Sequence, residues 1–473
     1  MPMNTTLSDN RSAYRQFAAI FLPIFFPIAI RNITNSLVSI VDVLMLGRLN
    51  DVALSGASFA NQFSLVVSLT LSGLTSGASV MIAQYWGRKD QNTIERIIAI
   101  ALRFSFSIVT VFFMLSAFFP RMLMRFYTND AAIIDAGVTY LHYICPSFFI
   151  LAFTDVYFTS MSAMGHVVVA TISKSSAVFT NLLLNWLLIY GKCGFPVLGL
   201  RGAAIATVCA RVVELAIAFV HAARNTQIRI CPRYVFQPQG VLIQDFLHLC
   251  IPVTVNDIIW VAGYNMTGSI VGHLGVSVTA AYSVACQVRE FMLVFSYGTA
   301  SSAAIIIGNA LGSGELDSAM DYGKKLIRIG TAIGIGAGLA VFGSQHLVAG
   351  IVQLPPKATE YLYYLLQIMT VFTMLQAFTT LINLGLFRAG GDPKFALYLD
   401  FAAMWGINVG MGMLSAYVLH LPVRVTLILI MLDEAVKAPV LYWRFRKNIW
   451  VRNITRSELK NCNEEIEAAE RLS

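Results

Sequence analysis

Long apolar segments separated by short polar stretches recur along the whole chain. A helix needs about 20 mainly apolar residues to cross the hydrocarbon layer of a bilayer, and twelve segments reach this length. They are residues 17–47, 53–85, 97–119, 132–160, 167–190, 199–222, 240–273, 278–311, 324–347, 358–388, 396–420 and 423–443. The pattern predicts an all-α polytopic membrane protein with twelve transmembrane helices.

The composition agrees with a chain that is embedded in a membrane over most of its length. Of its 473 residues, 57% are hydrophobic and 12% are charged, whereas soluble domains carry about 25% charged residues. The net charge is +8, but the lysines and arginines gather in short loops between apolar segments. This placement is typical of a cytoplasmic membrane face and argues against a nucleic-acid partner. An even number of spans puts both termini on one side, which the basic loops identify as the cytoplasm.

The chain also repeats itself at an offset of 225 residues. Sliding the sequence by this offset without gaps pairs Pro27 with Pro252 and Gly165 with Gly390. Between residues 47 and 87, ten positions meet an identical residue in the second half. Shared apolar composition does not place prolines and glycines in register, so the chain is predicted to contain two homologous halves.

The repeat predicts two six-helix lobes, joined by a cytoplasmic linker and followed by a cytoplasmic tail. Each lobe has an even number of spans, so both enter the membrane in the same direction. We therefore expect a pseudo-two-fold axis along the membrane normal. The predicted segments are residues 1–222, 223–239, 240–447 and 448–473, in that order.

No catalytic or metal-binding motif stands out. The seven cysteines are odd in number and scattered, and none forms a CxxC pair, which argues against a disulfide framework and a zinc site. The sequence contains neither HExxH nor a Walker phosphate loop. We therefore expect no enzymatic activity, no cofactor and no metal, and an ion gradient rather than ATP as the source of energy.

Four short motifs in both halves carry a family resemblance. They are VDVLMLGRL at 41–49, AQYWGRKD at 83–90, GLRGAAIAT at 199–207 and RAGGDP at 388–393. In this order they resemble the multidrug and toxic compound extrusion (MATE) family of prokaryotic type. The resemblance implies a secondary exporter driven by influx of protons or sodium, in the cell (inner) membrane. The acidic residues inside the spans favour small organic, cationic amphipathic compounds as its substrates. We expect a monomer, with a small-molecule substrate and the lipid bilayer as its partners.

A flippase of lipids or lipid-linked glycans, from the same superfamily, is the alternative function. Such proteins often have more helices and a strongly cationic cavity. Twelve spans with acidic residues inside them favour export of cationic compounds instead.

Oxygen-bearing side chains reach a similar depth in the first half. Asp42 lies near the outer end of the first helix, Asn181 and Asn185 share a face of the fifth helix, and Thr207 lies in the sixth. The resemblance implies that residues at these positions form a cation site. The family has an aspartate where this chain has Asn185, which weakens the case for sodium. Burial favours the neutral form of a carboxylate, so Asp42 is the expected proton carrier.

The second half offers a further group of ionisable residues. Asp257 in the seventh helix lies at a similar depth to Arg289 and Glu290 in the eighth. Ionisable groups inside spans are costly and mark functional sites or pairs. Two interpretations stay open: a second proton or cation site, or a plain Asp257–Arg289 ion pair. A pairing of Asp257 with Arg31 across the lobes is a bolder hypothesis.

Other charged residues within the spans are expected to be structural. Arg211 and Glu214 are three residues apart, as are Glu434 and Lys437, and both spacings predict ion pairs within one helix. The two lone acids Asp155 and Asp400 are the exception: the spacing identifies no partner for them, and each is a candidate to face the central cavity.

Overall fold

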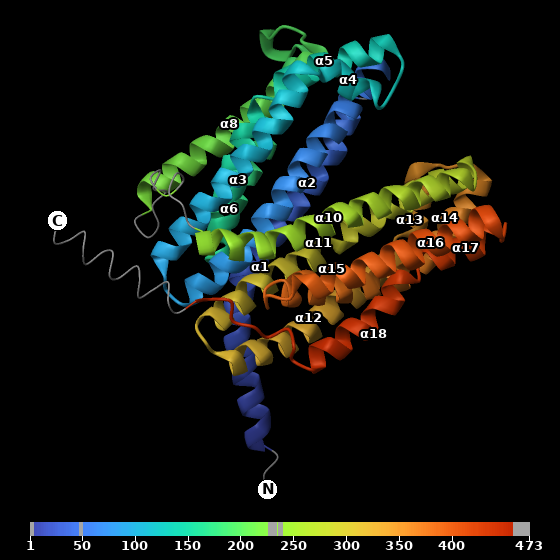
Figure 1. Cartoon of the computed structure of the whole chain (residues 1–473). Coiled ribbons are helices and arrows are strands. Elements are labelled where there is room, and N and C mark those ends of the chain that lie inside the picture. The colour runs from blue at the N-terminus through green and yellow to red at the C-terminus, as the bar shows by residue number, and fades with distance from the viewer. Residues whose placement is uncertain (1–3, 47–50, 226–233, 235–239, 457–473) are drawn as a thin grey trace, which may run out of the picture. The chain divides into compact units, whose positions relative to one another are not determined.

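A computed structural model describes residues 4–46, 51–225, 234 and 240–456, which are helical over most of their length (Figure 1). Contacts divide them into two compact units. The N-terminal unit runs from Ile30 to Thr254 and also takes Arg456, whereas the C-terminal unit takes the residues up to Ala29 together with Val255–Thr455. Each unit is described separately below.

Two long helices contribute to both units. Helix α1 (Asn4–Leu46) and helix α10 (Gly240–His273) each change unit along their length, after Ala29 and after Thr254. Both contain proline close to that point, at Pro27 and Pro252. A proline inside a helix removes one backbone hydrogen bond and favours a bend. The predicted lobes, 1–222 and 240–447, assign each helix to one lobe as a whole. The two compact units differ from these lobes because their boundaries fall inside α1 and α10.

The N-terminal unit consists of helices joined by short turns. Asp90 caps the start of α3 by accepting a hydrogen bond from the Thr93 backbone N–H at 3.1 Å, and Gly191 ends α7 in the left-handed conformation (φ +64°) that glycine adopts without strain. The elements are α2 (Asp51–Gly87), α3 (Gln91–Phe118), α4 (Pro120–Arg125), α5 (Ala131–Ile144), α6 (Ser147–Ala163), α7 (Val167–Tyr190), η1 (Lys192–Gly194) and α8 (Gly199–Arg224).

The C-terminal unit is also helical, but three of its segments have π-helical hydrogen bonding. Its elements after α10 are α11 (Val276–Gly312), α12 (Leu316–Gly343), α13 (Gln345–Val352), α14 (Pro356–Thr380), η2 (Leu381–Phe387), α15 (Pro393–Phe401), η3 (Ala402–Val409), α16 (Gly410–Met413), η4 (Leu414–Val418), α17 (Val423–Ile430) and α18 (Asp433–Arg446). The π-helical segments are η2, η3 and η4. Such segments are rare and frequently occur at functional sites.

The expected all-α membrane fold is confirmed. Within the described ranges, ten helices are long and apolar enough to cross a membrane, or eleven if the bent pair α5 and α6 forms one span. That pair, bent by 54°, covers the predicted span 132–160. The predicted last span, 423–443, is divided into α17 and α18. The two parts have 8 and 14 residues, so neither is long enough to cross a bilayer by itself, and the second also carries three buried charged residues.

Glycines of α2 mark a close helix crossing in the N-terminal unit. In the N-terminal unit, a Cβ on Gly73 or Gly77 of α2 would lie within 2.7 Å of Thr254 or Cys250 in α10. In the C-terminal unit, a Cβ on Gly298 of α11, the repeat partner of Gly73, would face α1 at an ordinary contact distance, 3.5 Å from the Phe25 ring. Gly73 thus faces the first part of α10 in the N-terminal unit, and Gly298 faces the first part of α1 in the C-terminal unit.

The first residues of the predicted tail pack against the C-terminal unit. The Trp450 side chain is fully buried and its ring stacks on Phe445 with centroids 5.6 Å apart. A Cβ on Gly390 would lie 2.0 Å from the Trp450 carbonyl oxygen, so a side chain larger than hydrogen does not fit there. The rest of the predicted tail, from residue 457, lies outside the described residues.

Candidate functional site

Three of the four residues predicted for the N-terminal site form one hydrogen-bonded chain. The Asn185 amide Nδ2 donates to Asn181 Oδ1 at 3.0 Å, and Asn181 Nδ2 donates to Thr207 Oγ1 at 3.3 Å. Both asparagines are buried, at 4% and 7% exposure. Residue 42 lies in α1, but the Asp42 side chain is outside the described part of the structure. These hydrogen-bonded side chains join α7 to α8. Their role as a cation site stays a prediction.

A second polar group in the N-terminal unit is built around Glu214 of α8. Lys174 of α7 contacts its carboxylate at 2.9 Å, and Thr154 Oγ1 of α6 donates to it at 3.5 Å. Arg211 instead donates to Ser147 Oγ at 2.6 Å. The predicted direct Arg211–Glu214 ion pair is therefore wrong: Lys174 makes the contact with the carboxylate, and Arg211 is only an electrostatic neighbour of Glu214.

The lone acid Asp155 of α6 lies near this group. Its carboxylate accepts a hydrogen bond from Thr75 Oγ1 of α2 at 3.0 Å. Arg31 of α1, Lys174 and Glu214 are its electrostatic neighbours. Asp155 is thus part of a polar group contributed by several helices of the N-terminal unit.

In the C-terminal unit, Asp257 of α10 has a partner that the sequence did not indicate. Its carboxylate lies 2.6 Å from the guanidinium of Arg388, whereas Arg289 pairs with its neighbour Glu290 at 2.8 Å. The predicted Asp257–Arg289 pair is wrong. Depth along a helix can be estimated from sequence, but the face on which a side chain lies cannot be fixed for two helices of unknown rotation.

The surroundings of Arg289 explain its orientation. Its guanidinium lies 5.7 Å from the Tyr264 ring centroid and 5.4 Å from that of Phe372. The faces of aromatic rings attract cations. Arg289 is 4% exposed, so these rings stabilise a charge that is removed from water.

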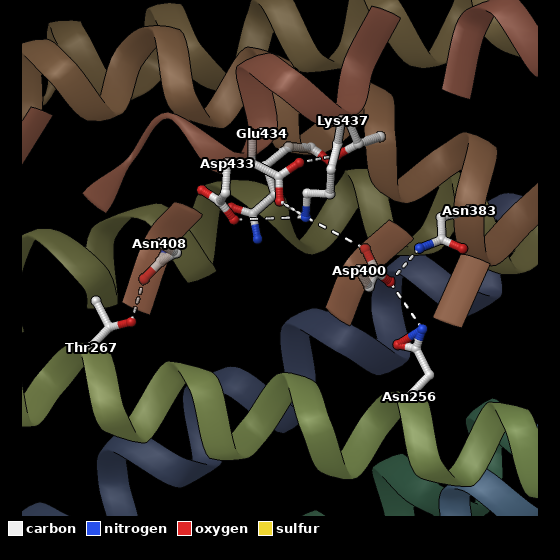
Figure 2. Close-up of polar contacts among 10 residues, drawn as sticks. Asn256, Thr267, Asn383, Asp400, Asn408, Asp433, Glu434 and Lys437 are labelled. Atoms are coloured by element: carbon white, nitrogen blue, oxygen red, sulfur yellow. Dashed lines mark hydrogen bonds and ion pairs between the residues drawn. The ribbon is translucent and has the colours of Figure 1, made fainter. Parts of the chain in front are cut away.

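The largest group of buried charges in the C-terminal unit surrounds one lysine (Figure 2). Lys437 Nζ lies 2.5 Å from Glu434 Oε1, 3.6 Å from Asp400 Oδ1 and 3.8 Å from Asp433 Oδ2. All four residues are at most 7% exposed. We call Asp400, Asp433, Glu434 and Lys437 the Lys437 cluster. The predicted Glu434–Lys437 pair is confirmed as part of it.

Polar side chains from several helices complete the surroundings of this cluster. Asp400 Oδ2 accepts hydrogen bonds from Asn256 Nδ2 of α10 at 3.0 Å and from Asn383 Nδ2 of η2 at 2.6 Å. The Thr379 hydroxyl of α14 donates to Glu434. Nearby, Thr267 Oγ1 of α10 donates to Asn408 Oδ1 of η3 at 2.5 Å (Figure 2). Two of the π-helical segments thus supply side chains to this region.

Sequence reasoning missed this assembly although part of it was visible. Asp433, Glu434 and Lys437 form a DExxK motif, whose i, i+3 and i, i+4 spacings place all three on neighbouring positions of one helix. Asp400 lies more than thirty residues earlier and had no partner in the sequence. Only the packing of η3, which begins two residues after Asp400, against α18 brings it to the lysine.

Comparison with known proteins places the chain in a family. The model of the MatE family matches residues 27–187 and again residues 252–414, so the second match begins at the repeat partner of the first. The uncharacterized transporter YisQ of Bacillus subtilis is 25% identical over 421 residues, which cover 87% of this chain and 90% of that protein. The probable multidrug resistance protein NorM of Listeria monocytogenes is 25% identical over 406 residues, covering 83% and 87% of the two chains.

Solved structures show the same fold. A multidrug resistance MATE family transporter of the MOP superfamily, in an outward-facing conformation, superposes with a TM-score of 0.83 at 19% identity, covering 91% of this chain and 95% of that one. A MOP superfamily transporter from Pyrococcus furiosus gives 0.82 over the same shares. The architecture of these neighbours is the two-lobed, twelve-helix arrangement. The chain belongs to the multidrug and toxic compound extrusion (MATE) family of membrane transporters.

Proposed function

We propose that this protein is a secondary exporter of small organic, cationic amphipathic compounds, coupled to the influx of protons or sodium. Family membership supports transport as the activity. Several relatives, among them YoeA of Bacillus subtilis, are described as probable multidrug resistance proteins, which supports small organic compounds as the substrate class.

The observation that supports coupling to an ion is the row of hydrogen-bonded side chains formed by Asn185, Asn181 and Thr207. Polar groups inside a membrane are costly and are retained where they serve ions or substrates. These three side chains converge from α7 and α8, at the positions where the family resemblance implies a cation site together with Asp42. No carboxylate stands at residue 185, which favours a proton on Asp42 over a sodium ion held by several charged ligands.

We further propose that the protein works as a monomer in the cell membrane with both termini in the cytoplasm. The basic loops of the sequence support this orientation through the preference of lysine and arginine for the cytoplasmic side. Its partners are the small-molecule substrate and the lipid bilayer.

The test is efflux of the fluorescent cation ethidium from proteoliposomes that contain the full-length protein. A proton gradient and a sodium gradient are imposed in turn on the wild type, Asp42→Asn and Asn181→Ala. Asp135→Asn, at a site whose side chain is 64% exposed, is the control. We expect gradient-driven efflux that both site variants lose and the control retains.

Each of the other outcomes contradicts a different part of the proposal. Efflux that survives Asp42→Asn would place coupling outside the N-terminal site. Absence of efflux under both gradients, with lipid-linked substrates moved instead, would favour the flippase.

A further inference from the structure

The Lys437 cluster contains more acidic than basic groups. Three carboxylates share a single ammonium group, and all three contacted oxygens lie within 3.8 Å of its nitrogen. The carboxylates are therefore close neighbours of one another. Like charges at such separations disfavour simultaneous ionisation, and burial disfavours the charged form of each group further.

Charges on the surrounding helices do not remove this excess. Arg388 at the end of η2 is held by Asp257 of α10, and Arg289 of α11 is held by Glu290. Tyr297 of α11, an electrostatic neighbour of Glu434, contributes only a phenol. The two nearby cations are thus matched by two nearby anions, and the cluster keeps its formal excess of two negative charges.

The hydrogen bonds distinguish the three carboxylates from one another. Asp400 accepts from Asn256 and Asn383, and Glu434 accepts from Thr379 and has the shortest contact with Lys437. Asp433 has the longest contact with the ammonium. The Asn408 side chain and the Glu434 backbone are hydrogen-bonding neighbours of its carboxyl group, but among the described residues its Oδ1 has no hydrogen bond of ordinary geometry.

The unmatched oxygen belongs to a side chain that is almost completely buried, because Asp433 is 2% exposed. A buried acceptor without a donor is costly. A proton would convert this carboxylate into a donor and would lower the charge of the cluster by one. The excess of negative charge and the poorly satisfied Asp433 Oδ1 therefore both point to a proton as the ligand.

We propose that Asp433 is a proton-binding site in the C-terminal unit, with Lys437 as a fixed counter-ion that keeps Asp400 and Glu434 ionised. A hydronium ion gives up one O–H bond and leaves as water, its proton forms one O–H bond with the Asp433 carboxylate, and no bond of the protein breaks. A sodium ion fits poorly, because the ammonium group already occupies the point that the three carboxylates share. This inference deepens the proposed function by assigning a coupling proton to the second lobe, and it rests on that function only for its connection to transport.

Infrared difference spectroscopy of the full-length protein in lipid, titrated with pH, tests the site directly. Protonated carboxyl groups absorb apart from carboxylates, and labelling with [4-¹³C]aspartate shifts an aspartate band in the unmutated protein. We expect a buried aspartic-acid band at neutral pH that responds to the label and disappears in Asp433→Asn. It should remain in Asp400→Asn and in the control Glu360→Gln, whose side chain is 64% exposed.

Lys437→Met tests the counter-ion. Without the ammonium group, a further carboxyl should take up a proton, so the carboxylic-acid band should grow at the same pH. A wild-type spectrum without a label-sensitive band, or a band that Asp433→Asn leaves unchanged, would overturn the proposal. The ethidium assay distinguishes failure of the proton site from failure of the proposed function. A band with the expected behaviour would support the proton site. Efflux driven by sodium alone in the same protein would contradict proton-coupled export.

Discussion

The carboxylate of Asp257 and the guanidinium of Arg388, 131 residues apart in the chain, lie 2.6 Å from each other. Arg388 is 7% exposed, so removing the aspartate leaves a cation with little access to water. We expect a double-mutant cycle of Asp257→Asn and Arg388→Gln to give a coupling energy of about 0.5–3 kcal/mol. The measurement is the free energy of unfolding in detergent micelles by denaturant titration.

The exposed pair Arg121–Asp135 is the matched control for that cycle. Its side chains are 70% and 64% exposed, and pairs of this kind contribute about 0–1 kcal/mol. Equal coupling energies for the two pairs would contradict the view that burial makes the Asp257–Arg388 contact the stronger one.

Lys174→Met should destabilise the N-terminal unit, because it leaves the Glu214 carboxylate buried without its ammonium partner. Removing one partner of a buried pair costs about 3–5 kcal/mol, and the 27% exposure of the Lys174 side chain should reduce this loss. Adding Glu214→Gln should recover part of the stability, since the Glu214 carboxylate is then no longer a buried charge without its partner. Denaturant unfolding of both variants checks this, and a Lys174→Met protein as stable as the wild type would refute it.

Gly77→Ala should destabilise the protein although alanine is the better helix former. Its Cβ would lie 2.6 Å from both Cα and Sγ of Cys250, and overpacking of this kind costs about 1–3 kcal/mol. Gly268→Ala in α10 is the control, because no described atom lies within 4 Å of its added Cβ. That substitution should be neutral or stabilising by up to about 1 kcal/mol. In thermal unfolding, the melting temperature should therefore fall for Gly77→Ala and stay equal or rise for Gly268→Ala.

Trp450→Ala should cost about 3–5 kcal/mol, as expected for deletion of a fully buried aromatic side chain. Trp450→Phe should cost less, because it keeps most of the stacking on Phe445 and loses mainly the hydrogen bond from Trp450 Nε1 to the Phe445 carbonyl. Limited proteolysis near residue 450 provides the readout. Equal resistance of wild type and Trp450→Ala would show that this segment is held by other contacts.

The fold was predictable because its main signals are local. Apolar segments of spanning length identify helices without knowledge of their neighbours, and Pro27 and Pro252 reveal the repeat by position alone. The last predicted span was harder, since α18 carries Asp433, Glu434 and Lys437 in a helix that packs inside the protein.

Pairings between helices were predictable only in part. Asn181, Asn185 and Thr207 came together as expected, since two of them share one helix and α8 follows α7 directly. The partners of Asp257 and Glu214 were missed, because they depend on how each helix is rotated against the next. Asp400 meets Lys437 for the same reason, through contacts that no spacing along the chain encodes.

The change of unit inside α1 and α10 has a consequence for how the chain reaches its native state. Residues before Ala29 leave the ribosome first, yet their packing partners lie beyond Val255. The C-terminal unit therefore cannot complete its core until translation has passed through the whole N-terminal unit. Contacts between residues so distant in sequence make folding slow. Neither half of the gene encodes a complete unit, so a fragment ending at the linker would leave the phenylalanines of α1 without the surface they bury against.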